Sequence, residues 1–182
     1  MAISLRRGPK LPSSVRDAVD LGPGERVLSW APVLLGAGPG VAGEPSGATL
    51  VATNHALYAV DAAGEATLTR PWHEVDSGSW SAELTQLTVT WVDGAKPGQW
   101  VLGDTTLLPE TLRERVQASV VLTQKIELGP RRTARAVIRQ DLGGGGLVEQ
   151  VVLGRGARAD DPEVAAATEA ALAYLREQVG LS

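Results

Sequence analysis

The segment RPWHEVDSGSW, residues 70–80, gathers residue types that could act on a substrate. It holds His73, one of only two histidines in the chain, together with the carboxylates of Glu74 and Asp76. An imidazole beside a carboxylate can serve as a general acid–base pair or as part of a metal site. In a regular strand, however, both carboxylates point to one side and His73 points to the other. The sequence therefore predicts a strand with a packed Trp72 and an acidic edge, and a His–acid pair would need a bulge.

A metal site would have to draw on His55 as well as His73. Two histidines with no placed carboxylate make an incomplete ligand set, because a structural zinc site uses four ligands. The chain has no cysteine, which excludes thiolate ligands, disulfides and cysteine nucleophiles. We therefore expect no metal site in this chain.

Two glycine-rich segments lack the context of a cofactor site. GPGVAG, residues 38–43, matches G-x-G-x-x-G, but a dinucleotide fingerprint needs a preceding strand and a helix that opens within it. Here a strand-like run follows instead of a helix. Gly143–Gly146 are not followed by the Lys-Ser/Thr pair of a phosphate-binding loop. We therefore predict that they connect the two strands of a hairpin. The sequence implies no cofactor, and because it also lacks a G-x-S-x-G motif we expect the chain not to be an enzyme.

RRTARAVIR, residues 131–139, is the most basic segment of the chain. On a strand, Arg131, Arg135 and Arg139 share one face, where successive members of the face lie about 6 to 7 Å apart. Such a row is a candidate binding face for phosphates or an acidic partner. The alternative is a solvated strand face paired with acidic residues such as Glu149, and the sequence leaves both interpretations open.

Composition is typical of a globular protein of one domain: 182 residues, 43% hydrophobic and 21% charged. The net charge of −4 disfavours a dedicated nucleic-acid binder, which would normally carry a basic face. The N-terminal MAISLRRGPK lacks the apolar core of a secretory signal, so a cytoplasmic location is expected.

Tryptophan replaces phenylalanine, which is absent from the sequence. We expect most of the five tryptophans to fill the core and one or two to stand exposed as interface anchors.

Periodicity predicts an α+β fold. The run around Leu87, Val89 and Trp91 alternates with polar residues, as a half-buried strand does. Helices are expected at 13–21 with Ser13 as the cap, at 109–120, and at the C-terminus, where Asp160 or Asp161 caps the helix and Gly180 ends it. Residues 36–47 are expected to form an irregular loop. Strands are expected at residues 25–35, in two pieces within 49–60 around a turn at Asn54, from 66 to 80 with a bend at 77–78, within 83–92, and at 99–103, 121–128, 133–140 and 147–153.

Four strand-like runs resemble a known family. ERVLSWAPV, TLVATNHALYAV, RPWHEVDSGSW and LTVTWVDG are similar to the strand series of bacterial pleckstrin-homology-like and GRAM-like domains, as in small actinobacterial proteins. The resemblance covers residues 25–122 and implies a bent antiparallel sheet or split barrel plugged by the helix at 109–120. Residues 36–47 lack the basic cluster of phosphoinositide-binding members, so that lipid class is disfavoured.

The expected organisation has three parts. A tail and short helix occupy residues 1–24, the pleckstrin-homology-like part occupies 25–122, and extra strands with a C-terminal helix occupy 123–182, packed on the same domain. Strand edges within 124–153 must be covered by the terminal helix or by a second subunit. The sequence therefore allows a homodimer as well as a monomer.

The absence of converging reactive groups favours a non-catalytic, cytoplasmic binding or scaffolding module with a protein partner. One alternative is nucleic-acid or acidic-partner binding through Arg131, Arg135 and Arg139. The other is an enzyme or small-ligand carrier that uses the barrel mouth, which requires a deep pocket with a few converging polar groups.

Overall fold

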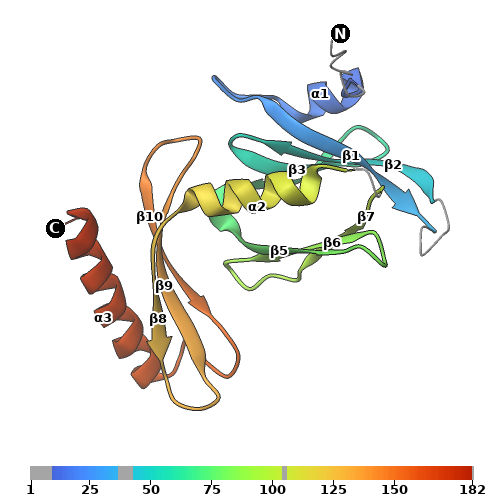
Figure 1. Ribbon diagram of the computed structural model, residues 1–182. Coiled ribbons are helices and arrows are strands. Elements are labelled where there is room, and N and C mark those ends of the chain that lie inside the picture. Colours follow the sequence, from blue (N-terminus) through green and yellow to red (C-terminus); the bar gives the residue numbers. More distant parts are fainter. Residues whose placement is uncertain (1–9, 37–42, 104–105, 182) are drawn as a thin grey trace, which may run out of the picture.

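Two antiparallel sheets form the N-terminal body of the protein (Figure 1). The computed structural model describes residues 10–36, 43–103 and 106–181. The first sheet has the strand order β1-β2-β3-β4, and the second has the order β5-β6-β7. Their strands are β1 (Val27–Leu35), β2 (Glu44–Thr53), β3 (Ala56–Val60), β4 (Ala66–Pro71), β5 (Val75–Ser81), β6 (Gln86–Trp91) and β7 (Gly98–Val101).

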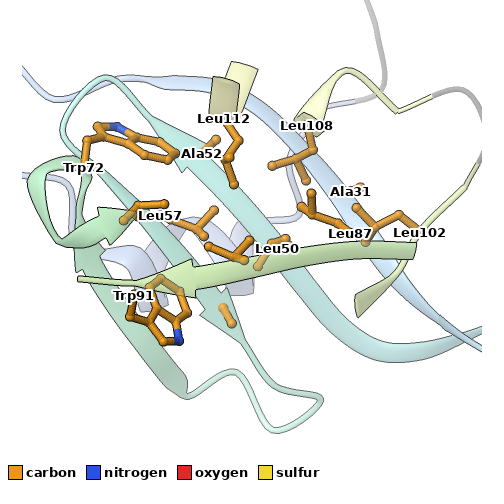
Figure 2. Packing of buried hydrophobic residues seen from close by; sticks show 13 residues of the cluster. Ala31, Leu50, Ala52, Leu57, Trp72, Leu87, Trp91, Leu102, Leu108 and Leu112 are labelled. Carbon is orange, nitrogen blue, oxygen red and sulfur yellow. The ribbon is translucent and has the colours of Figure 1, made fainter. Parts of the chain in front are cut away.

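A hydrophobic core lies between these two sheets and is closed by α2 (Leu108–Ser119). Leu50 of the first sheet, Leu87 of the second and Leu112 of the helix all belong to this core, as Figure 2 shows. β6 alternates between buried and half-buried residues along its length, which confirms the predicted period of two. The predicted helix at 109–120 is also confirmed, with bounds one residue earlier.

A second core covers the outer face of the first sheet. There α1 (Ser13–Val19) packs Val15 and Val19 against β2 and β3. The first sheet is therefore covered on both faces, and every residue of β3 is buried. The predicted helix is confirmed, but the predicted Ser13 cap is wrong: the N-cap is Pro12, which lacks a side-chain donor or acceptor, and Ser13 lies inside the helix.

The C-terminal part adds a third antiparallel sheet with one helix on one face (Figure 1). Its order is β10-β9-β8, and β8 follows α2 without an intervening loop. Val164 and Leu175 of the helix pack on Ile126 and Ile138 of the sheet, in a core separate from the other two. The elements are β8 (Val120–Glu127), β9 (Thr133–Gln140), β10 (Leu147–Leu153) and α3 (Pro162–Val179).

α3 begins and ends as the sequence predicts. The side chain of Asp161 accepts a hydrogen bond of 3.0 Å from the backbone N–H of Glu163, and Pro162 occupies the first turn. Gly180 ends the helix with a left-handed φ of 70°, a conformation that glycine adopts without steric cost.

The segment at 70–80 differs from the predicted single strand. β4 ends at Pro71, a 3₁₀ turn spans Trp72–Glu74, and β5 begins at Val75. This turn carries the indole of Trp72 into the core, where its Nε1 donates a hydrogen bond of 2.9 Å to the carbonyl of Thr53. The predicted bend at residues 77–78 is also wrong, because β5 runs through them and the irregularity falls between Val75 and Ser77.

The predicted loop at 36–47 is partly strand. β2 begins at Glu44, which pairs with Leu35 of β1 and so satisfies backbone groups that a loop would leave to solvent. Residues 37–42, which hold most of GPGVAG, lie outside the described residues.

Within the described ranges no strand pairs with a strand of another sheet, so the two N-terminal sheets do not close into a barrel. No helix of the described part is both long and apolar enough to cross a membrane.

We expect Gly78→Ala to destabilise the protein, because a Cβ at Gly78 would collide with the buried side chain of Leu112 on α2. Overpacking of this kind costs about 1–3 kcal/mol, measurable as the free energy of unfolding in urea. Gly146→Ala is the matched control, because a Cβ there meets open space. Equal unfolding free energies for the two variants would contradict the close packing of β5 on α2.

Candidate functional site

A buried carboxylate fixes the start of β1. Glu25 lies two residues before the strand, and its side chain is only 5% exposed. Its Oε1 accepts hydrogen bonds from Thr53 Oγ1 at 2.5 Å and from the Tyr58 hydroxyl at 2.8 Å. Its Oε2 accepts one from the backbone N–H of Gly22 at 3.1 Å. A buried charge with several donors is well satisfied, so it ties the entry of β1 to the β2–β3 hairpin.

Asn54 completes this anchor from the turn between β2 and β3. Its Oδ1 accepts from the backbone N–H of Arg26 at 2.6 Å, and its Nδ2 donates to the carbonyl of Gly24 at 3.1 Å. The sequence predicts a turn at Asn54, and the structure confirms it. The long-range role of TNHALY in holding residues 24–26 was missed, although a Thr-Asn pair before a tyrosine was the signal available.

An open groove of about 700 Å³ runs along β1. β1 itself supplies most of the lining, from Val27 to Leu34. Leu11 and Arg16 add to it from the region of α1, and the opposite wall consists of Gly103, Thr106 and Leu107, between β7 and α2. The volume falls in the range of ordinary ligand sites, and the lining is mostly apolar.

The groove follows the free edge of β1 rather than either face of the sheet. β1 is an edge strand, since its only partner in the described chain is β2. Ala31 belongs to the core between the sheets, whereas Trp30 packs on the α1 side, yet both line the groove. Residues from both faces can border one groove only where it passes along the strand edge.

The walls expose apolar side chains. Leu28 on β1 is 39% exposed and Leu107 on the opposite wall is 66% exposed. Trp30 is half-buried, as are Trp80 and Trp100, whereas Trp72 and Trp91 are buried. None of the five tryptophans is exposed, so the exposed anchor expected from the sequence is not found; Trp30 is the one that lines the groove.

Two polar groups of the groove lack partners among the described residues. Ser29 is 9% exposed and its buried Oγ makes no hydrogen bond, and Arg16 is the one charged residue of the described lining and forms no ion pair. Among the described residues that line this groove there is no histidine and no carboxylate. The described lining can bind an apolar group and offers polar atoms at Ser29 and Arg16, but it presents no acid–base pair.

The histidines lie elsewhere, each near a carboxylate that sequence spacing did not single out. His73 Nδ1 is 3.6 Å from Asp141 Oδ1, and His55 Nδ1 is 3.9 Å from Glu25 Oε2. Backbone N–H groups of the Gly143–Gly146 turn, helped by the histidines, lower the pKa of Asp141. In the described ranges no three such residues are arranged to hold a metal ion.

Two of the three arginines of the row, Arg135 and Arg139, contact the N-terminal body. Arg135 pairs with Asp76 of β5, and Arg139 is 2% exposed, donating to Ser119 Oγ at 3.0 Å with its Nη2 at 3.9 Å from Asp76 Oδ1. Burial, and then the charge of Arg135, lowers the pKa of Arg139 to about 10. Arg131 stands exposed just before β9. Glu149, the partner considered from the sequence, pairs with Arg176 instead.

Comparison with known proteins assigns no family: no protein-family model matches the chain, and no curated protein matches its sequence.

The Glu25 anchor predicts alkaline instability through Tyr58. Burial, followed by the hydrogen bond and charge of Glu25, raises the pKa of Tyr58 above its ordinary value of about 10. The unfolded chain therefore loses this proton at a lower pH than the folded protein does, and the contribution of Tyr58 to stability is lost as pH rises above 10. We expect Tyr58→Phe to show a shallower fall of unfolding free energy from pH 9 to 11 in urea titrations. An unchanged slope would contradict the buried pairing.

The contacts of Asp76 with Arg135 and Arg139 predict energetic coupling between Asp76 and Arg139. Asp76→Asn leaves two guanidinium groups without their carboxylate, and we expect a loss of about 2–4 kcal/mol in unfolding free energy. The same change in an Arg139→Met background should cost clearly less, as measured by a double-mutant cycle. Asp93→Asn, which breaks an exposed pair with Arg70, is the control with a smaller effect. Additive losses for Asp76 and Arg139 would refute the coupling.

Proposed function

We propose that this protein is a non-catalytic binding module whose groove along β1 accepts a segment of a protein partner. The observation that carries the proposal is an apolar groove at an unpaired strand edge, with Leu28 and Leu107 exposed in its walls. Exposed apolar surface gathered at one place, rimmed by polar groups, is typical of an interaction site. The described part of the lining offers backbone and side chains for binding but no reactive pair.

The proposal includes a pleckstrin-homology-like arrangement of residues 25–122 and a cytoplasmic location. A four-stranded sheet, then a three-stranded sheet, then a helix that closes the core between them supports the first part. The lack of cysteine is consistent with the second.

A protein partner fits better than the alternatives. The space between the sheets is filled by side chains such as Trp72, Leu50 and Leu57, which disfavours a small-ligand carrier that uses the barrel mouth. Arg135 and Arg139 are engaged with Asp76, which disfavours a phosphate-binding face on β9. The groove on β1, by contrast, is apolar and open to solvent.

We expect the full chain to enrich a common pattern from a phage-displayed library of random short peptides. Leu107→Asp should weaken a selected peptide by about tenfold or more, because it places a charge in the apolar wall. Leu84→Asp is the matched control: Leu84 is 49% exposed but lies outside the groove lining. Fluorescence anisotropy of the labelled peptide measures both affinities. Failure to select any peptide sensitive to Leu107→Asp would contradict the proposal.

A further inference from the structure

We infer that the partner segment binds as an extended strand that pairs with the free edge of β1 and carries an acidic residue for Arg16. The inference rests on the proposed function and specifies the backbone conformation and chemistry of the occupant.

The edge of β1 offers unpaired backbone groups to an added strand. Its residues pair on one side only, with β2, so alternate N–H and C=O groups point into the groove. An extended peptide that adds to such an edge gains main-chain hydrogen bonds, and pockets for alternate side chains give it specificity. A helix could not satisfy these groups, because its own backbone bonds are internal.

The usable part of the edge is short and well defined. Register shifts fall between Val27 and Ser29 and between Pro32 and Leu34, and regular pairing holds from Ser29 to Pro32. Pro32 has no N–H to donate, so the donor row ends before it. Few main-chain bonds can form over so short a stretch, and the exposed apolar walls must supply much of the remaining affinity.

The two faces of the added strand meet different surroundings. Alternate side chains of an extended segment point to opposite sides of a sheet. One side would face α1, where Trp30 and Arg16 lie, and the other would face Leu107 on the segment that leads into α2. The expected ligand therefore alternates, with an apolar residue toward Leu107 and a carboxylate on the α1 side, where it can pair with Arg16.

A second copy of the chain fits this pattern less well. β1 contains no acidic residue, so pairing β1 with β1 of another copy leaves Arg16 without a carboxylate from the added strand. The second strand would also bring its own Pro32 to the short edge. Arg16, which forms no ion pair with a described residue, thus favours a different, acidic segment over self-association.

N-methylation of a selected peptide tests the backbone pairing. A strand bonds to β1 through alternate amides only, so methylating one alternating set should weaken binding about tenfold or more per lost hydrogen bond, while the other set is tolerated. Fluorescence anisotropy with the full-length chain reports the affinities. Equal tolerance of both sets by a peptide that remains sensitive to Leu107→Asp would overturn strand addition and leave the proposed function standing.

A charge exchange tests the role of Arg16. Arg16→Glu should weaken the selected peptide about tenfold, and replacing the acidic residue of the peptide by lysine should restore binding to that variant. Arg155→Glu is the matched control, because Arg155 is also exposed but lies in the C-terminal part. Selected peptides that lack an acidic residue, or that ignore Arg16→Glu, would overturn the acidic segment.

Light scattering of the full chain tests whether a second copy of the chain occupies the groove. We expect one mass at all concentrations in the micromolar range. A stable dimer that Leu28→Asp disperses would assign the groove to a second copy and overturn the inference, and absence of any peptide sensitive to Leu107→Asp would defeat both the inference and the proposed function.

Discussion

The carboxylate of Glu25, buried at the entry of β1, is the interaction on which the arrangement of this protein rests. An isolated buried charge is costly, and here the hydroxyls of Thr53 and Tyr58 and the backbone of Gly22 compensate for that cost. Because these donors lie on the β2–β3 hairpin and on the chain before β1, folding the hairpin also fixes where β1 begins. The position of its free edge, and with it the groove, follows from that constraint.

Polar contacts also connect the N-terminal body to the C-terminal sheet. Asp76 holds Arg135 and Arg139 at the junction between the N-terminal body and the C-terminal sheet, and the amide of Gln150 donates to the carbonyl of His73 at 2.7 Å. These polar contacts join parts whose hydrophobic cores are separate. His73, Arg135 and Arg139 thus lie near carboxylates of other elements, whereas the open apolar groove lies along β1.

Periodicity predicts local structure here because burial alternates regularly. The strand around Leu87, Val89 and Trp91 and the capped helix at Pro162–Val179 follow directly from residue spacing. Spacing also shows that Arg135 and Arg139 share a face, but it cannot show that this face meets Asp76, which lies 59 residues before Arg135. The 3₁₀ turn at Trp72 escaped prediction for the same reason, since it depends on a hydrogen bond to Thr53 across the sheet. The groove was missed because an edge strand and an interior strand have similar sequences, and Pro32 was the one local sign of an edge.

Residue-resolved amide hydrogen exchange, with and without a peptide selected on this protein, tests the central claim that the edge of β1 is the binding surface. The account predicts slower exchange for amides within Ser29–Ala31 on binding, with exchange in β4 and β10 unchanged, although both are also edge strands. Protection at β4 or at β10, with β1 unaffected, would contradict it.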